Sequence, residues 1–521
     1  MKRKTIWLLI ILFTALSSLP FLVPGCAILS LFAFIPLFAL ADGCSDNHIK
    51  HANWLYFSAF FLFNAVTTFW ICWISPIGAI AAISINALQM FFIFWLFVKS
   101  KKRLKGALPY LLFISAWLVW ERIYQMVEIS WPWLVLGESF ATSPKLAQWF
   151  EYTGPLGGSL LILLTAAVIY NIYKTKGRGR IALIGFAAIL LVVPPIVSLA
   201  IYSNYQEVGE AREVVAVQPN IDAYTEKHGG LDQNLQDEKL LSLAKPLISD
   251  NTCYVITPET FGYNLDLDNP TSNSTYCNIE SFIEQHPQID FLLGSLTYRI
   301  FTSKAKASVA ANPLQDDYWY DMYNTALMIG PKGIINFYHK SKLVPGVEII
   351  PYQQYVPFLG KLISKFGGST SSYARQKELS VLEDRYQNKV GAMICYESIY
   401  SEYYRKTALF GADFVAVITN DGWWGDTPGY HQHFRFARLR AIETRRDVVH
   451  VANTGISGFI NQRGDVLQKT GWWEPVAIKD NIHANDALTF YAVNGDIIGR
   501  VACFLFFMLC AAWILYAVKR S

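Results

Sequence analysis

Three positions in this chain carry side chains whose types suit acyl transfer. Glu259 follows the run Tyr-Val-Ile-Thr-Pro, Lys340 lies in Tyr-His-Lys-Ser-Lys, and Cys395 follows Val-Gly-Ala-Met-Ile. A free thiol has a pKa of about 8.5, so it needs a nearby cation or base to become a useful thiolate. We expect Lys340 and Glu259 to sustain a thiolate at Cys395. Taken singly, the three would be an ordinary surface lysine, a helix-start carboxylate and a buried core thiol.

Short runs rich in Val, Ile, Leu and Ala must position these side chains. The runs alternate with helical patterns, which predicts an α/β layered domain. Because the runs are almost continuously apolar, we expect strands that are buried on both faces. The expected strands are 213–217, 254–256, 291–293, 326–329, 390–394, 414–418 and 448–452. Most of them end in polar residues, and ligands in such folds gather where strands end.

The rest of the chain is strongly apolar. Of its 521 residues, 53% are hydrophobic and only 16% charged, whereas soluble chains carry about a quarter charged residues. Eight runs approach the roughly 20 residues that cross a bilayer. These runs are 6–23, 27–41, 54–74, 77–98, 107–120, 157–173, 181–202 and 501–518. The first run and Cys26 also resemble a processed lipoprotein leader, but Pro24 and the apolar run that follows favour uncleaved helices.

We therefore predict a membrane α-helical bundle of about eight transmembrane helices that carries an α/β domain. The predicted domains are 1–202 with seven helices, 203–499 as the α/β domain, and 500–521 as a closing helix and tail. With eight spans, 15 Lys and Arg lie in short segments on the side of the termini and 2 on the other side. Such residues mark the cytoplasmic side, which places the α/β domain outside the cytoplasm. The net charge of +4 gives no indication of nucleic-acid binding.

The three reactive segments, in this order and within this topology, resemble the Glu–Lys–Cys triad of the carbon–nitrogen hydrolase (nitrilase) superfamily. The membrane setting resembles one branch, the bacterial apolipoprotein N-acyltransferases. Other segments that match this branch are 217–221, 323–325, 418–426 with the following Gln432-His433, and 451–455. The similarity covers essentially the whole chain and implies an extracytoplasmic αββα sandwich domain.

The resemblance implies a role for each matching residue. Glu259 would be the general base, Lys340 the electrostatic partner and Cys395 the nucleophile. The Lys340 ammonium and the backbone N–H of Tyr396 would form the oxyanion hole. The implied supporting residues are Glu348, Glu397 and Asn324.

Of these supporting residues, Glu348 is expected to orient Lys340 or Glu259, and Glu397 to belong to the same network. Asn324 has an implied positioning role. The chain departs from the family at two places. Tyr224 lies near a position where many members have a tryptophan, and the loop that leads to Glu348 has a different sequence.

The implied activity is a two-step, ping-pong acyl transfer. A phospholipid, expected to be phosphatidylethanolamine, would acylate Cys395 as a thioester. The α-amino group of the S-diacylglyceryl-cysteine of a lipoprotein would then take the acyl chain. The resemblance further implies a monomer in the bacterial inner membrane, with its catalytic domain facing the periplasm and no cofactor. The alternatives are a membrane-tethered amidase that hydrolyses a small amide, and a lipid-handling scaffold with an inactive domain, against which the intact triad argues.

Two groups of aromatic residues are candidates for a substrate or membrane interface. Trp131 and Trp133 match an aromatic segment of the family. Phe358, Leu362 and Phe366 lie at helical spacing with lysines on the opposite side, an arrangement that suits insertion at a lipid interface. An ordinary surface helix fits that second pattern equally well.

The remaining polar residues have ordinary interpretations. Cys253 and Cys277 could form a disulfide in an oxidising compartment, which would leave Cys395 free. His431 and His433 have no acidic or cysteine partner at ligand spacing, so we predict no metal site. The arginines within 438–446 are expected on a solvated helix face or in salt bridges.

Overall fold

The structure is a computed structural model that describes residues 1–226, 230–315, 317–356, 358, 360 and 372–518. Residue contacts divide the chain into two compact units, which we call the helical unit and the α/β unit. The helical unit comprises Met1–Cys72, Ala79–Tyr205 and Asn494–Ser521, and the α/β unit comprises Trp73–Gly78 and Gln206–Val493.

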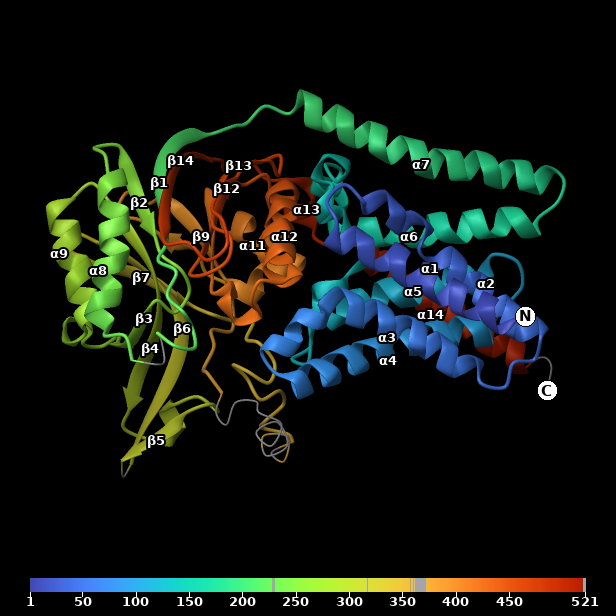
Figure 1. Ribbon diagram of the computed structural model, residues 1–521, viewed down its shortest axis with the longest axis horizontal. Helices are drawn as coiled ribbons and strands as arrows, with labels where there is room; N and C mark the ends of the chain where they lie inside the picture. The colour runs from blue at the N-terminus through green and yellow to red at the C-terminus, as the bar shows by residue number, and fades with distance from the viewer. Residues whose placement is uncertain (227–229, 316, 357, 359, 361–371, 519–521) are drawn as a thin grey trace. The chain divides into compact units, whose positions relative to one another are not determined.

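The helical unit consists of apolar helices, most of them joined by short connections; a longer segment between α5 and α6 contains η3 (Pro132–Leu134), η4 (Leu136–Thr142) and η5 (Pro144–Leu146) (Figure 1). Its main elements are α1 (Arg3–Leu22), η1 (Ala27–Phe32), α2 (Phe34–Asp46), α3 (Ala52–Thr68), η2 (Phe69–Trp73), α4 (Pro76–Ser100), α5 (Leu108–Tyr124), α6 (Phe150–Lys174), α7 (Arg178–Asn204) and α14 (Ile497–Val518). Among the described residues, seven helices are long and apolar enough to cross a membrane. α5 has 17 residues and corresponds to the remaining predicted run, 107–120. The predicted helical membrane region is thus confirmed.

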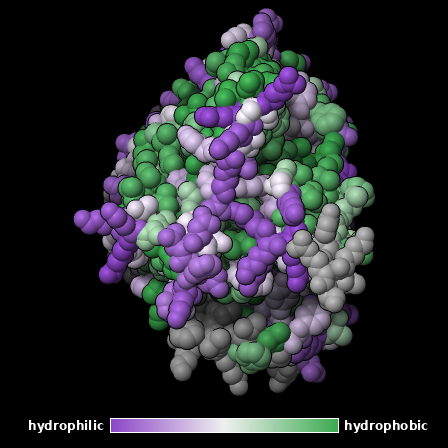
Figure 2. Space-filling model, turned by 90° about the vertical axis from the view of Figure 1, so that its right-hand side faces the viewer, coloured by the Kyte–Doolittle hydropathy of each residue, from purple (hydrophilic) through white to green (hydrophobic). Residues whose placement is uncertain are grey.

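Polar side chains of the helical unit gather near helix ends. Figure 2 looks toward the end of this unit near the N-terminus, where hydrophilic side chains lie among hydrophobic ones. Asp42, close to the end of α2, accepts hydrogen bonds from Lys101 and from the Tyr170 hydroxyl and forms an ion pair with Lys174. These contacts connect the ends of α2, α4 and α6.

The α/β unit contains two sheets with helices on their outer faces (Figure 1). The first sheet contains β1 (Glu210–Gln218), β2 (Thr252–Ile256), β3 (Gly262–Asp266), β4 (Asp290–Phe301), β5 (Asn312–Gln315), β6 (Tyr318–Gly330), β7 (Gly333–His339) and β14 (Val476–Ala484). The second contains β8 (Leu382–Glu383), β9 (Lys389–Ile394), β10 (Phe414–Thr419), β11 (Val448–Ala452), β12 (Gly458–Ile460) and β13 (Val466–Lys469). The main helices are α8 (Gln233–Ala244), α9 (Ser274–Gln285), α11 (Ser401–Leu409) and α12 (Pro428–Thr444). α8 and α9 pack on the first sheet, and α11 and α12 on the second.

All seven expected strands are present. β9, β10 and β11 run parallel to one another, and every residue of β10 and β11 is buried. Continuous apolar sequence is what a parallel strand covered on both faces requires. The carboxyl ends of these three strands therefore meet at one edge of the sheet, where Cys395 directly follows β9.

Three of the arginines at the end of α12 and in the turn that follows it are buried. Arg440 and Arg446 are 0% exposed and Arg445 is 3% exposed. Arg440 pairs with Glu443 at 3.0 Å, while Arg446 donates to the carbonyls of Ala412 and Ala487 at 2.6 and 2.7 Å. The solvated-face alternative was therefore wrong, because backbone carbonyls and a carboxylate compensate the burial of the guanidinium groups.

The disulfide that we considered is not formed. Cys253 and Cys277 are both free thiols. The Cys253 thiol donates to the carbonyl of Asn251 at 3.5 Å, and the Cys277 thiol to the carbonyl of Thr271 at 3.3 Å. Cysteine spacing alone does not determine pairing, since the two side chains belong to different elements, β2 and α9.

Candidate active site

Three strands of the α/β unit end in residues with a left-handed backbone. Asn220 follows β1 with φ of 50°, Thr260 follows β2 with φ of 50°, and Cys395 follows β9 with φ of 52°. Non-glycine residues rarely adopt this conformation, and it concentrates at functional sites. Cys395 opens the short helix η9 (Cys395–Ile399), so the chain turns sharply at the candidate nucleophile.

Lys340 lies between two carboxylates in the interior of the α/β unit. Its Nζ is 2.9 Å from Oε1 of Glu259 and 2.9 Å from Oε1 of Glu348. Lys340 is 1% exposed, Glu259 5% and Glu348 9%. A buried charge must be paired. Here one ammonium is shared by two carboxylates, so the three side chains together carry a net negative charge.

Asn324 completes this arrangement from β6. Its Nδ2 donates to Oε1 of Glu259 at 2.7 Å and to Oε1 of Glu348 at 3.1 Å. The backbone N–H of Val344 donates to the other oxygen of Glu348 at 2.8 Å. The structure therefore brings together four of the residues singled out from the sequence, namely Glu259, Asn324, Lys340 and Glu348.

The charges around Cys395 favour its neutral form. Burial raises the pKa of the Cys395 thiol, the negative charge of Glu259 raises it further, and Lys340 lowers it, with a net shift well above the usual thiol value. For Lys340, burial lowers the pKa, but Glu259 and Glu348 raise it well above the usual lysine value. This direction opposes the thiolate expected from the sequence, and burial is its largest cause.

The raised pKa of Cys395 predicts the pH dependence of its alkylation. Because the thiolate is the nucleophile, its reaction with iodoacetamide should still be accelerating at about pH 10, where free cysteine with a pKa of about 8.5 has levelled off. The measurement is the rate of label incorporation into the Cys395 peptide by mass spectrometry, with free cysteine as the reference. A rate that levels off below about pH 8 would instead indicate a resting thiolate.

Glu397 connects the Lys340 loop to the Cys395 strand. Its Oε1 accepts from the backbone N–H of Ser341 at 2.7 Å, from that of Lys342 at 3.0 Å and from the Tyr338 hydroxyl at 2.7 Å. Its Oε2 accepts from the backbone N–H of Ile394 at 3.1 Å. These bonds join the residues just after Lys340 to the residue just before Cys395, so Glu397 is placed to set the separation of the two.

Tyr396 and the two tryptophans are the next residues predicted from the sequence. Tyr396 is buried, and the oxyanion role of its N–H stays a prediction. In the helical unit, Trp133 is buried, stacks on Trp131 with ring centroids 5.3 Å apart and packs against Trp70 at 4.9 Å. Trp131 is half-buried, and the substrate-interface role of both tryptophans stays a prediction.

The amphipathic segment is only partly described. Phe358 is 67% exposed, as an interfacial anchor requires. Leu362 and Phe366 lie outside the described residues. The interfacial role of all three stays a prediction.

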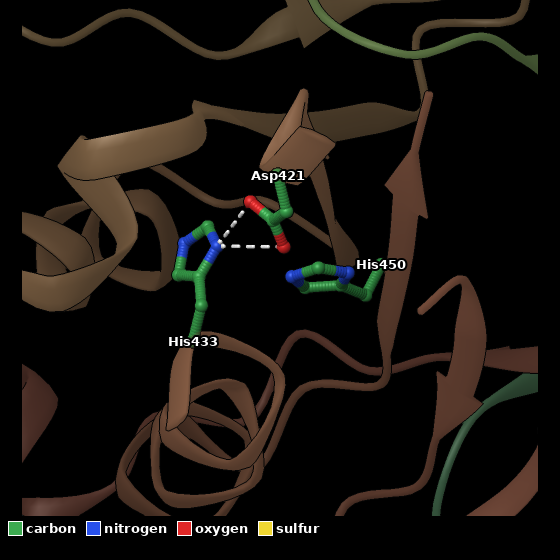
Figure 3. A group of neighbouring side chains, drawn as sticks. All are labelled: Asp421, His433 and His450. Atoms are coloured by element: carbon green, nitrogen blue, oxygen red, sulfur yellow. Dashed lines mark hydrogen bonds and ion pairs between the residues drawn. The ribbon is translucent and has the colours of Figure 1, made fainter. Parts of the chain in front are cut away.

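A second polar cluster lies behind Cys395 and was missed from the sequence. Asp421, His433 and His450 are fully or almost fully buried, and one potential ligand atom of each lies within 4.8 Å of the others, the spacing that a metal ion would need (Figure 3). The premise that His433 lacks an acidic neighbour was therefore wrong. Both ring nitrogens of His433 already face protein oxygen atoms, Asp421 on one side and the Cys395 carbonyl on the other. This is the arrangement of a hydrogen-bonded network, and its only signal in the sequence was that its segments match the family.

Comparisons with known proteins show the family of this chain. Residues 216–483 match the family described as carbon-nitrogen hydrolase, and residues 13–168 match the family described as apolipoprotein N-acyltransferase N-terminal domain. The apolipoprotein N-acyltransferase of Chlorobaculum tepidum is 28% identical over 457 residues, which cover 84% of this chain and 83% of that protein. That of Geobacter metallireducens is 24% identical over 507 residues, which cover 94% and 92%.

Among solved structures, Saccharomyces cerevisiae Nit3, a member of branch 10 of the nitrilase superfamily, is similar with 14% identity and a TM-score of 0.39, covering 54% of this chain and 92% of Nit3. The carbon–nitrogen hydrolase match alone spans more than half of the chain, and the second match lies in its helical unit. The chain therefore belongs to the carbon–nitrogen hydrolase superfamily and, within it, to the apolipoprotein N-acyltransferases.

Proposed function

We propose that this multi-pass membrane protein transfers an acyl chain from a phospholipid to the N-terminus of lipoproteins through a thioester on Cys395. The observation that carries the proposal is the buried Lys340 shared by Glu259 and Glu348, together with a thiol at a left-handed strand end whose pKa both Lys340 and Glu259 affect. The match of both domains to apolipoprotein N-acyltransferases supports this choice of substrates.

In the first step, the Cys395 sulfur attacks the ester carbonyl carbon of the phospholipid while Glu259 takes the thiol proton. The tetrahedral oxyanion is stabilised by the Lys340 ammonium and by the N–H of Tyr396; one such donor is worth about 3 kcal/mol. Collapse breaks the ester bond, and Glu259 returns the proton to the departing glycerol oxygen. The products are a thioester on Cys395 and a lysophospholipid.

In the second step, the neutral α-amino group of an S-diacylglyceryl-cysteine attacks the thioester carbonyl. Glu259 takes a proton from the attacking nitrogen, the carbon–sulfur bond breaks, and Cys395 recovers its proton as the amide forms. Thiol deprotonation only during attack is consistent with the raised pKa of Cys395. A site sheltered from water protects the thioester from hydrolysis, and Cys395 is only 9% exposed.

We further propose that the protein acts as a monomer in the bacterial inner membrane with the α/β unit on the periplasmic side. The excess of 15 over 2 basic residues in short segments supports this orientation, because basic loops stay cytoplasmic. Both substrates are anchored in lipid, so a catalytic domain tethered to the bilayer reaches them at the membrane surface.

Intact-mass analysis tests this function. The purified protein is incubated with phosphatidylethanolamine, and in parallel with a diether analogue that has the same headgroup but no ester carbonyl. We expect one acyl mass to appear on the Cys395 peptide with the ester lipid only, and to disappear when a diacylglyceryl-cysteinyl peptide is added, which gains that mass. If the acyl mass on Cys395 is lost by hydrolysis as fast without the peptide as with it, the transferase function would be contradicted.

A further inference from the structure

We propose that His433 and Ser398 are positioning residues that polarise the peptide bond between Cys395 and Tyr396. Asp421 is a third positioning residue, which holds His433 in place. This inference rests on the proposed function and deepens it, because the N–H of that peptide is the proposed oxyanion donor. None of the three residues has a role in the steps described above.

The Cys395 carbonyl receives two side-chain hydrogen bonds. The Ser398 hydroxyl donates to it at 2.8 Å, and Nε2 of His433 lies 3.2 Å from it. The Ser398 oxygen is also 2.8 Å from Nε2 of His433. Ser398 is 2% exposed and His433 1%, so water does not compete strongly for these bonds.

The partners of His433 constrain the positions of its ring hydrogens. A hydrogen bond from Nε2 to the Cys395 carbonyl requires a hydrogen on Nε2, because a carbonyl oxygen can only accept. On the other side, Nδ1 lies 3.0 Å from Oδ1 of Asp421, which also accepts from the Thr419 hydroxyl at 2.7 Å (Figure 3). With a hydrogen on Nε2, a second hydrogen is shared between Nδ1 of His433 and Oδ1 of Asp421. The contact with Asp421 fixes the orientation of the ring.

His450 faces the same pair from β11. Its Nδ1 donates to the carbonyl of Ile456 at 3.0 Å, so its Nε2 carries no hydrogen. Burial and the neighbouring His433 lower the pKa of His450 to about 3. His450 is thus neutral and leaves the hydrogen bond between Asp421 and His433 intact.

The consequence for catalysis follows from the geometry of one peptide unit. The carbonyl of Cys395 and the N–H of Tyr396 belong to the same planar group. Hydrogen bonds that draw electron density to the carbonyl oxygen make the N–H at the other end a stronger donor, because hydrogen bonds in a chain polarise one another. The same two bonds also fix the orientation of the peptide at the left-handed turn at Cys395, where φ is 52°.

The test compares two reactions of the same sulfur in the full-length protein. Thioester formation from phosphatidylethanolamine passes through an oxyanion, whereas alkylation by iodoacetamide does not. Ser398→Ala removes one hydrogen bond to the carbonyl without changing any charge. We expect its rate of thioester formation to fall roughly tenfold, as for a donor weakened but not removed, while its alkylation rate stays within about twofold of wild type.

A charge-matched pair tests His433. In Asp421→Asn/His433→Gln, the glutamine amide can still donate toward the Cys395 carbonyl. In Asp421→Asn/His433→Asn, the side chain is one methylene shorter and cannot reach. We expect the glutamine variant to form the thioester at least about tenfold faster than the asparagine variant, with equal alkylation rates. Circular dichroism and thermal unfolding check that the variants are folded.

Three outcomes would overturn the inference. The first is that Ser398→Ala and the asparagine variant form the thioester as fast as wild type. The second is that their alkylation rate falls in parallel with their acylation rate, which would indicate a purely structural role. If wild type itself takes up no acyl group from phosphatidylethanolamine, the proposed function fails, and this inference fails with it.

Discussion

Replacing Lys340 by methionine is expected to slow thioester formation by at least about 10³-fold, because the variant loses a charged oxyanion donor. It should also lower the free energy of unfolding by about 3–5 kcal/mol, since two buried carboxylates lose their shared cation. The pKa of Lys340 is raised, so its stabilising contribution is fully present below the usual lysine range and is lost only as the pH rises above it. Both quantities are therefore measured near pH 7, by single-turnover mass analysis and by denaturant unfolding.

A charge-matched control separates stability from chemistry. Lys340→Met/Glu348→Gln restores the net charge of −1 that Lys340, Glu259 and Glu348 carry together in the native protein. We expect this double variant to regain most of the lost stability while thioester formation stays at the level of Lys340→Met. Recovery of activity along with stability would show that Lys340 acts only as a structural cation.

Glu397→Gln should destabilise the α/β unit and slow acylation without touching a reacting atom. Glutamine keeps one acceptor oxygen, so at least one backbone N–H among Ser341, Lys342 and Ile394 would face an amide N–H instead. Leaving such a buried donor without a partner costs about 1–3 kcal/mol. Thioester formation should fall roughly 10²-fold, because small displacements of reacting groups are costly.

The matched control for Glu397 is Tyr338→Phe. It removes the 2.7 Å hydrogen bond from the Tyr338 hydroxyl to Glu397, together with the contacts of that hydroxyl with Ser341 and Tyr403, but leaves the three backbone bonds in place. A hydrogen bond to a charged group contributes about 1.5–3 kcal/mol, so we expect a loss of unfolding free energy of at least that size and a modest change in acylation rate. If Glu397→Gln acylates as fast as Tyr338→Phe, the connection through the backbone is not what positions Lys340.

Much of the site was predictable because its residues belong to short segments with strong local character. The strands that precede Glu259 and Cys395 were recognised as continuous apolar runs, and their ends marked where chemistry would occur. β13 and β14 were not predicted, because antiparallel edge strands with mixed polarity lack that pattern. β12 was not predicted because it has only three residues. Hydropathy alone identified the helical unit, since length and apolar composition are properties of each helix by itself.

The polar partners were decided by contacts between distant segments. Glu397 binds backbone groups about 55 positions away, His433 finds Asp421 on another element, and the arginines of α12 and its following turn are buried against carbonyls. The protonation of Cys395 likewise depends on burial and on two charges brought from β2 and β7. The sequence by itself determined the membrane region, the main strands and the reactive residue types, because these depend on local composition. Only the tertiary structure decided which charges meet, since the energy of a buried polar group depends on its neighbours in space.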